Sequence, residues 1–272
     1  MKRYQDFFLI SDIDGTLANN EHRVSEKNKE AIADFVAQGG HFAVATGRTQ
    51  RNVVPYMTGL TINAPCILYN GGALYSWQEK RFLKTKHLES RELAGFLRHC
   101  IALFPQMCIE VFTHEQLYVI TDPANVDEHM IREKQEFTYA ALDDILDKTW
   151  IKIILCDSHE NLLASRAILS LFHLEDKTNN FFSAVTYLEI VANHVSKGNM
   201  LGELLKIPGF HGKKIIAAGD FQNDIEMLQI ADCGVAPENA QDDVKKIANV
   251  IAVNNDEDLI HDIVYRIIPT LL

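Results

Sequence analysis

The sequence lacks paired cysteine motifs, long apolar runs and basic tracts. Its five cysteines are odd in number, include no Cys-x-x-Cys pair, and mostly stand beside Ile, Leu or Phe. This pattern excludes a disulfide framework and a zinc site, and it predicts buried thiols in a reducing compartment. No stretch approaches the roughly twenty apolar residues that are needed to cross a bilayer. We therefore expect no membrane partner.

The balance of charge is acidic. The formal net charge is −11, and no basic run offsets it locally. Such a chain would repel an extended phosphate backbone, so we expect no nucleic-acid partner. A small phosphorylated metabolite is compatible with the same charge, because one lysine, a metal ion and backbone donors can neutralise it locally.

The first apolar run is too short for a leader segment. Residues 7–10 are followed at once by Ser11 and Asp12, which is typical of a strand and not of a signal peptide. We therefore expect a cytoplasmic protein. No feature indicates an obligate protein partner.

The order of apolar runs predicts an α/β protein with an insertion. A length of 272 residues suits roughly two domains. Short apolar runs alternate with amphipathic stretches near both ends, at 7–10, 42–45, 66–69, 215–218, 234–236 and 250–253. This alternation predicts a parallel sheet with helices on both sides. The middle differs: a hairpin is expected at 73–86, strands at 108–112, 117–120 and 150–156, and helices near 140–146 and 162–172, which together indicate an α+β insert.

The most informative motif is Asp12-Ile13-Asp14-Gly15-Thr16, which follows the first apolar run. Alternation along an extended backbone puts Asp12 and Asp14 on one side, and Gly15 permits a sharp turn. Such a pair can hold a divalent cation, and one carboxylate can then attack an electrophile while its neighbour moves protons. An ordinary Asp-Gly turn is the alternative. An EF-hand is excluded, because its glycine and glutamate positions hold Leu17 and Arg23.

Three further polar segments stand at strand-to-helix junctions. They are Thr46-Gly47-Arg48, Ser196-Lys197-Gly198 and Gly219-Asp220-Phe221-Gln222-Asn223-Asp224. In a parallel α/β sheet these junctions share one edge, where ligands bind. We therefore expect a hydroxyl, a lysine and a second acidic cluster to gather beside Asp12 and Asp14.

Taken in this order, the four segments resemble the haloacid dehalogenase-like (HAD) hydrolase superfamily, and most closely its Cof-type (subfamily IIB) phosphatases. The resemblance spans almost the whole chain. It implies a Rossmann-like parallel-sheet core formed by residues 1–82 and 188–272, and an inserted α+β cap domain formed by residues 83–187. It also implies that Asp12 is the nucleophile and Asp14 the general acid and base.

The resemblance assigns the other site residues as well. Thr46 and Lys197 resemble the phosphoryl-binding pair, with Gly47 beside them. Asp220 resembles the Mg²⁺ ligand that acts with Asp12 and the backbone carbonyl of Asp14, and Asn223 and Asp224 resemble the residues that complete the phosphate and metal shell. Arg48 has two interpretations, a clamp on phosphate or a sugar hydroxyl and a salt bridge on the core surface.

One segment departs from the family pattern. Residues 234–240 are Gly-Val-Ala-Pro-Glu-Asn-Ala, where the family often has Gly-Val-Ala-Met-Gly-Asn-Ala. No carboxylate, hydroxyl or lysine of the expected centre is missing. We therefore expect Pro237 and Glu238 to alter the rim of the site more than its chemistry.

The expected function is that of a magnesium-dependent phosphatase. It would hydrolyse a small phosphorylated metabolite, with sugar phosphates ranked first by analogy, through an aspartyl-phosphate intermediate. A phosphomutase of the same superfamily is one alternative, although such enzymes usually carry a helical cap. A non-catalytic phosphate-metabolite binding or signalling protein is another, although receiver domains are far shorter and lack a second acidic cluster. P-loop chemistry is excluded, because no Gly-x-x-x-x-Gly-Lys-Ser/Thr sequence occurs.

Overall fold

The structure, a computed structural model, describes residues 2–126, 130 and 136–272, and it divides into two compact units. Unit 1 comprises Met1–Lys84 and Ser196–Leu272, and unit 2 comprises Thr85–Val195. The sequence placed the second boundary at residue 187, eight residues before the observed end of unit 2. The difference arises because Tyr187–Ala192 forms a strand, β11, that pairs with β9 (Trp150–Cys156) inside the sheet of unit 2.

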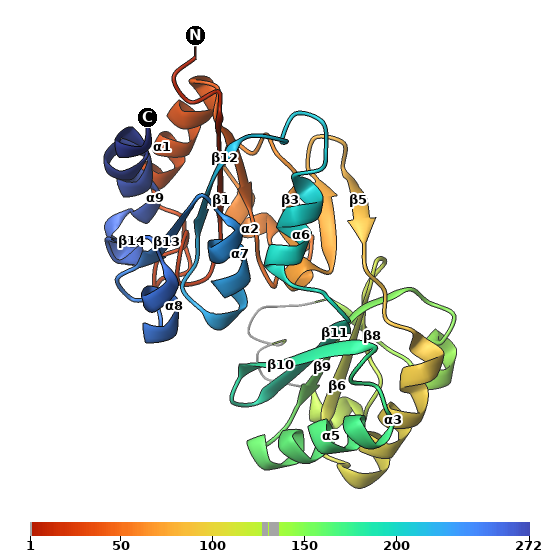
Figure 1. The fold of residues 1–272 in the computed structure, drawn as a ribbon. Coiled ribbons are helices and arrows are strands. Elements are labelled where there is room, and N and C mark those ends of the chain that lie inside the picture. Colours follow the sequence, from red (N-terminus) through yellow and green to blue (C-terminus); the bar gives the residue numbers. More distant parts are fainter. Residues whose placement is uncertain (1, 127–129, 131–135) are drawn as a thin grey trace. The chain divides into compact units, whose positions relative to one another are not determined.

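A five-stranded parallel sheet forms the centre of unit 1 (Figure 1). Its order is β14-β13-β12-β1-β2, with bounds Val250–Ala252, Cys233–Pro237, Lys214–Ala218, Phe7–Ser11 and His41–Val44. Every residue of β1 is buried, as expected for a strand covered on both faces. The parallel α/β core predicted from the sequence is thus confirmed.

The direction of winding reverses between β1 and β12. From β1 the chain moves outward to β2, whereas from β12 it moves the other way to β13 and β14. Right-handed crossovers therefore put α1 (Glu26–Ala37) on one face, and α7 (Ile225–Ile230) and α8 (Asp242–Ile247) on the other. The carboxyl ends of β1 and β12 are therefore the switch point, where such sheets bind ligands.

The helices of unit 1 begin where polar caps precede apolar stretches. Ser25 caps α1 by accepting a hydrogen bond from the Asn28 amide. Ser196 caps α6 (Lys197–Leu204) in the same way. Helix α1 contacts α9 (Leu259–Asp262), and α6 contacts α7. The short α2 (Val54–Met57) follows the β2 loop.

The strand expected at residues 66–69 is not a sixth strand of the core sheet, because it lacks a continuous series of backbone pairs with β2. β3 (Cys66–Leu68) pairs instead with β4 (Ala73–Ser76), which neighbours β5 (Arg81–Thr85) in a three-stranded sheet. One parallel bridge, Ala45 to Ile67, joins β3 to the end of β2. The reason is the tight turn after β3, which returns the chain antiparallel before a helical crossover can form.

Unit 2 is an α+β unit. Its six-stranded sheet has the order β10-β11-β9-β6-β7-β8, and the strands not yet bounded are β10 (Thr178–Ala184), β6 (Cys108–Thr113), β7 (Leu117–Val119) and β8 (Phe137–Tyr139). Side chains of α3 (Ser90–Leu103) and α5 (His159–Leu171) share one apolar core with this sheet. The helix expected near residues 140–146 is a short 3₁₀ turn, Leu142–Ile145.

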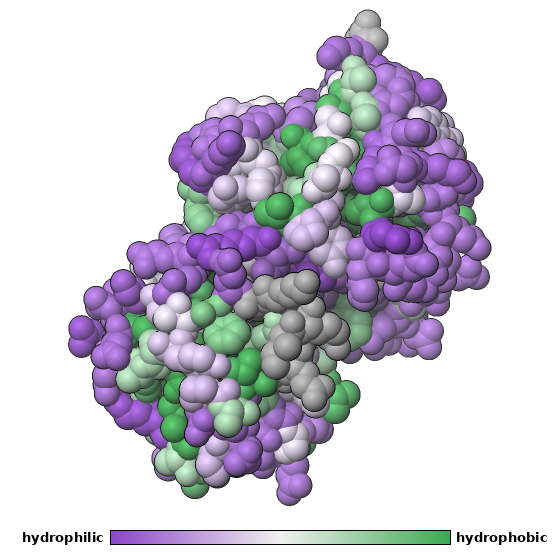
Figure 2. Space-filling model, turned by 180° about the vertical axis from the view of Figure 1, so that it is seen from behind, coloured by the Kyte–Doolittle hydropathy of each residue, from purple (hydrophilic) through white to green (hydrophobic). Residues whose placement is uncertain are grey.

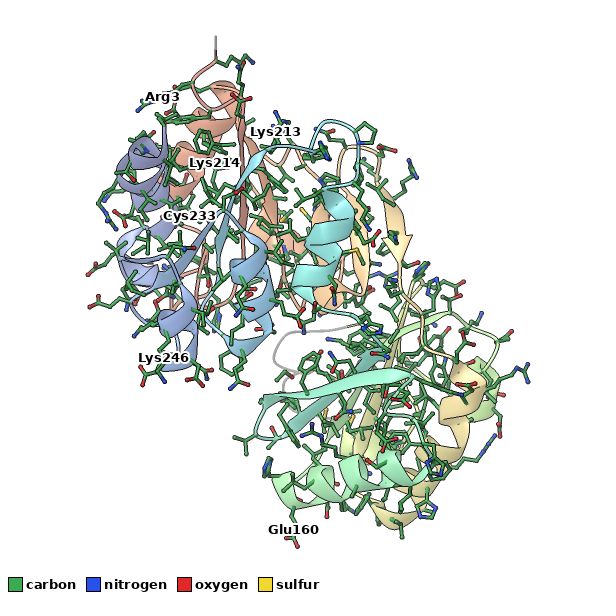
Figure 3. All side chains as sticks on the ribbon, viewed as in Figure 1. Arg3, Glu160, Lys213, Lys214, Cys233 and Lys246 are labelled. Atoms are coloured by element: carbon green, nitrogen blue, oxygen red, sulfur yellow. The ribbon has the colours of Figure 1, made fainter. Side chains whose placement is uncertain are left out.

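The surface is predominantly polar. Hydrophilic side chains cover most of the face in Figure 2, and the apolar ones lie in small separate groups. Among the described residues, no helix is both long and apolar enough to span a bilayer. In Figure 3, Lys213 and Lys214 mark the start of β12, where Lys214 Nζ donates to the carbonyl of Leu271 at 2.7 Å. That contact ties the C-terminal segment to the sheet.

Candidate active site

The two acidic motifs meet because β1 and β12 are neighbours in register. Ser11 pairs with Ala218, so the residues that follow both strands leave the sheet at the same edge. The Asp12 amide continues the ladder by donating to the Ala218 carbonyl at 2.9 Å. Gly15 then turns at φ +76°, and a Cβ on it would lie 2.5 Å from Asp220 Oδ2. Only glycine fits this turn without displacing the second motif.

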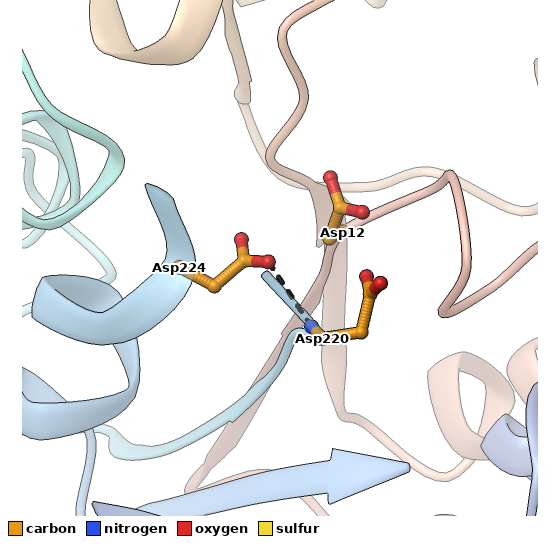
Figure 4. A group of neighbouring side chains, drawn as sticks. All are labelled: Asp12, Asp220 and Asp224. Carbon is orange, nitrogen blue, oxygen red and sulfur yellow. Dashed lines mark hydrogen bonds between the residues drawn. The ribbon is translucent and has the colours of Figure 1, made fainter. Parts of the chain in front are cut away.

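Three carboxylates gather at this edge (Figure 4). Oxygens of Asp12, Asp220 and Asp224 lie within 4.8 Å of one another. Asp12 and Asp224 are buried. Asp224 Oδ2 accepts the backbone N–H groups of Asp220 at 3.1 Å and of Phe221 at 3.2 Å. Asp224 therefore orders the loop that presents Asp220.

Lys197 lies between two of these carboxylates. Its buried Nζ donates to Asp12 Oδ1 at 2.6 Å and to Asp224 Oδ1 at 2.7 Å. Burial alone would lower the pKa of the Lys197 ammonium, but the charges of both carboxylates outweigh burial and raise the pKa. Lys197 is therefore a fixed positive charge beside the proposed nucleophile.

Burial raises the pKa values of Asp12 and Asp220. The pKa of Asp12 is raised well above its usual value, because burial and the three neighbouring aspartates outweigh the opposing charge of Lys197. The pKa of Asp220 is raised to about 6, chiefly by burial and against a hydrogen bond from Thr16. That bond joins Thr16 Oγ1 to Asp220 Oδ1 at 2.8 Å. Thr16 closes the Asp12 motif, and no pattern in the sequence predicts this role for it.

Asp14 lies apart from the three-carboxylate cluster. Its side chain is 44% exposed, and Arg48 binds it with two hydrogen bonds, Nε to Oδ2 at 2.8 Å and Nη2 to Oδ1 at 2.7 Å. Of the two interpretations of Arg48, the structure thus contains the salt bridge. The guanidinium carbon also lies 4.3 Å from the centre of the Tyr56 ring.

A second polar group surrounds Thr46, which is buried at the end of β2. Thr46 Oγ1 accepts from the Arg48 amide at 3.2 Å, and the Thr46 carbonyl accepts from the Asn70 amide at 3.0 Å. Asn223 Nδ2 donates to Asn70 Oδ1 at 3.0 Å, and a Cβ on Gly47 would lie 3.0 Å from Asn70 Nδ2. The sequence-predicted residues Thr46, Gly47 and Asn223 therefore come together around Asn70.

Asn70 has two interpretations from the sequence. Asn70-Gly71-Gly72 follows a strand toward the same edge as the motif segments, so it is either a substrate contact or an ordinary turn. Asn70 adopts φ 55°, a left-handed conformation that asparagine tolerates better than most residues. The role of its side chain depends on contacts with residues far away in sequence.

The unusual rim segment keeps its connection to the site. Asn239 Nδ2 donates to the Gly15 carbonyl at 2.8 Å, and Asn239 Oδ1 accepts from the Asn255 amide at 3.0 Å. Pro237 is the last residue of β13, and Glu238 follows it. Asn239 thus positions the turn after Asp14, a role that the sequence reasoning missed.

The donor set fits a magnesium ion. Carboxylate oxygens are among the ligands that Mg²⁺ prefers. The three carboxylates and the Lys197 ammonium have a net charge of −2 when all are ionised, which matches one divalent cation. Because Asp224 already accepts three hydrogen bonds, Asp12 and Asp220 are the carboxylates better placed to ligate.

Comparison with known proteins places this geometry in a family. The profile of the haloacid dehalogenase-like hydrolases matches residues 9–264. The 5-amino-6-(5-phospho-D-ribitylamino)uracil phosphatase YitU of Bacillus subtilis is 26% identical over 93% of this chain and 94% of its own length. A haloacid dehalogenase-like hydrolase from Bacteroides thetaiotaomicron has a crystal structure with TM-score 0.85 and 27% identity, covering 97% of this chain and 100% of that one.

One relative is much longer than this chain. The chloroplastic endoribonuclease YBEY of Arabidopsis thaliana is 29% identical over 95% of this chain, but the match covers only 46% of that protein. More than half of the protein that is named an endoribonuclease therefore has no counterpart in this match. The chain belongs to the haloacid dehalogenase-like hydrolase family and, within it, to the Cof-type phosphatases, which are phosphoric monoester hydrolases.

Proposed function

We propose that this protein is a magnesium-dependent phosphatase that hydrolyses a small phosphorylated metabolite through a phosphoryl group carried on Asp12. The observation that carries the proposal is the position of Lys197 Nζ, 2.6 Å from Asp12 Oδ1, together with the clustering of the Asp12 and Asp220 carboxylates. A sugar or sugar-alcohol phosphate is the proposed substrate class. The name of the B. subtilis relative supports it, because that substrate carries its phosphate on a ribityl chain.

The fixed charges remove the main barrier to attack. A carboxylate and a phosphate charge about 4 Å apart repel by roughly 4 kcal/mol at an effective dielectric constant of 20. Lys197 offsets this repulsion from a position already fixed before substrate arrives, so no reorganisation is needed at the moment of reaction. When bound by Asp12 and Asp220, a magnesium ion would supply further charge neutralisation and polarise a phosphoryl oxygen.

The reaction has two steps. In the first, an oxygen of Asp12 attacks phosphorus in line, the bond from phosphorus to the ester oxygen breaks, and Asp14 gives that oxygen its proton. In the second, Asp14 takes a proton from water, which displaces Asp12 from phosphorus and releases inorganic phosphate. The exposure of the Asp14 side chain supports this role, since both the ester oxygen and water must reach it.

The α+β composition of unit 2 favours hydrolysis over the phosphomutase alternative. We propose further that unit 2 is the part of the chain that selects the leaving group. The proposal is supported by the bounds of unit 2, Thr85–Val195, which are close to the residues 83–187 that the resemblance implies for an inserted cap.

A phosphate-release assay over a panel of sugar, nucleotide and cofactor phosphates tests the proposal. Wild type with Mg²⁺ should release phosphate from at least one sugar phosphate, excess chelator should abolish the release, and added Mg²⁺ should restore it. Asp12→Asn should be inactive on every substrate while folding normally. Turnover by Asp12→Asn, or full activity after verified metal removal, would rule out the proposed centre.

A further inference from the structure

The paired hydrogen bonds between Arg48 and Asp14 restrain a side chain that would otherwise rotate. A carboxylate that is 44% exposed samples several rotamers unless a partner holds it. Arg48, whose side chain is only 17% exposed, engages one oxygen with Nε and the other with Nη2. This bidentate geometry fixes both the direction and the plane of the carboxylate, which a single bond would not.

Arg48 is itself restrained from the other side. Its guanidinium carbon lies 4.3 Å from the centre of the Tyr56 ring, within the range of a cation–π contact. Its backbone amide donates to Thr46 Oγ1 at 3.2 Å. The orientation of Asp14 is therefore defined through Arg48 by Thr46, in the loop that follows β2, and by Tyr56 of α2.

We infer that Arg48 is a positioning residue that aims the Asp14 carboxylate at the leaving-group oxygen, with Tyr56 as its support. This inference rests on the proposed function, in which Asp14 transfers the proton. The Nε and Nη2 edge is the part of arginine that would clamp a phosphate with two bonds, and Asp14 already engages it. The geometry thus favours action through Asp14 over direct phosphate binding.

The two roles of Arg48 predict different kinetics. Asp14 serves both steps, so the first step is measured by itself: Arg48→Ala should slow phosphoenzyme formation from a sugar phosphate by about 10- to 100-fold. Phosphoenzyme formation from an aryl phosphate should slow by less than about threefold, because a phenolate leaves without a proton. The substrate concentration that gives half the maximal rate of phosphoenzyme formation should change little for either substrate. A phosphate clamp would instead raise that concentration for both substrates to a similar extent.

A double-mutant cycle tests whether Arg48 acts through Asp14. If it does, Arg48→Ala should cause no further loss in an Asp14→Asn background, because the group that it orients no longer transfers a proton. Arg48→Lys keeps the positive charge but cannot donate two parallel hydrogen bonds to Asp14. It should therefore recover only part of the sugar-phosphate activity that Arg48→Ala loses. Added methylguanidine should restore activity to Arg48→Ala more for the sugar phosphate than for the aryl phosphate.

Matched variants control for folding and test the contact of Tyr56 with Arg48. Arg266 makes the same two-bond pair with Asp262 on the C-terminal helix, so Arg266→Ala removes an equivalent pair outside the site and should leave both rates unchanged. Tyr56→Phe keeps the ring and should resemble wild type, whereas Tyr56→Leu should show a weaker version of the Arg48→Ala pattern. Circular dichroism and thermal unfolding establish that each variant is folded.

The outcomes separate this inference from the proposed function. Equal losses of the phosphoenzyme-formation rate on both substrates, or additive losses in the double mutant, would overturn the positioning role and leave the phosphatase proposal intact. If wild type released phosphate from neither substrate, the proposed function itself would fail. A selective loss on the sugar phosphate with guanidine rescue supports both.

Discussion

Lys197 donates a hydrogen bond to Asp12 across 185 residues of sequence, with Nζ 2.6 Å from Oδ1. One partner follows the first strand of unit 1, and the other begins the helix after unit 2. The contact forms only when both segments of unit 1 fold together. A buried lysine therefore gains its partners, and the acidic motif gains its counter-charge, in the same event.

Replacing Asp14 should separate the two steps of the reaction. Asp14→Asn keeps the nucleophile and the backbone carbonyl but loses the proton donor and base. An aryl phosphate should therefore phosphorylate this variant far faster than a sugar phosphate does, and the following hydrolysis should be slow with both. Rapid-quench measurement of the phosphoenzyme checks this, and equal losses of the phosphorylation rate would remove Asp14 from the general-acid role.

Magnesium affinity should depend on pH through Asp220. Because burial raises the pKa of Asp220 to about 6, protons and the cation compete for this carboxylate in the mildly acidic range. For one displaced proton, affinity should weaken by about tenfold per pH unit below that pKa and level off above it. Calorimetric titration of Mg²⁺ from pH 5 to 8 measures the slope, and an affinity independent of pH would contradict the assignment.

The stability of the metal-free protein should change in the opposite sense. The folded pKa of Asp220 lies above the usual aspartate value of 3.8, so the folded state binds this proton more tightly than the unfolded chain. The stabilisation from protonation is complete below about pH 4 and is lost as pH rises through about 6. Denaturant titrations with chelator, compared between wild type and Asp220→Asn, isolate this contribution.

Thr16 should be needed for tight metal binding although it is not an expected ligand. Thr16→Val removes the hydroxyl that donates to Asp220 Oδ1 at 2.8 Å and should weaken Mg²⁺ binding or activity by about 10- to 100-fold. Thr16→Ser keeps the donor and should retain most of the affinity. Identical Mg²⁺ affinities for the two variants would show that the hydrogen bond has no such role.

Gly71 should be irreplaceable for a steric reason that the sequence does not reveal. Gly71 and Gly209 have similar positive φ angles, +99° and +96°, but a Cβ at Gly71 would lie 2.1 Å from the Ser196 carbonyl oxygen. No atom of the residues that the structure describes lies within 4 Å of a Cβ at Gly209. Gly209→Ala should therefore cost only the roughly 1–2 kcal/mol of left-handed strain, and Gly71→Ala clearly more. Equal losses in urea unfolding would contradict the collision.

Removing unit 2 should spare chemistry more than selectivity. The deletion should join Lys84 to Ser196 by a short linker, since cutting at residue 187 would leave β11 without the strand β9 with which it pairs. The shortened protein should still hydrolyse an aryl phosphate and should discriminate less among metabolites. If it folds and keeps the parent's order of preference, unit 2 is not the selector.

The sequence by itself determined the class of fold and most of the site. Apolar alternation predicts the parallel core, and the four motif segments identify Asp12, Lys197 and Asp220 before any contact is known. Local patterns suffice here because parallel strands in a βα alternation deliver their carboxyl ends to one edge. The Ser25 cap is predictable for the same reason, since capping depends on neighbours in sequence.

Only the tertiary structure decided which side chains meet. The pairing of Arg48 with Asp14, the hydrogen bond from Thr16 to Asp220, and the roles of Asn70 and Asn239 join segments that no sequence periodicity connects. The strand that ends unit 2 was likewise assigned to the core until its pairing with β9 was known. Each of these depends on distance in space and on burial, which raises the cost of leaving a polar group or a strand edge unpaired.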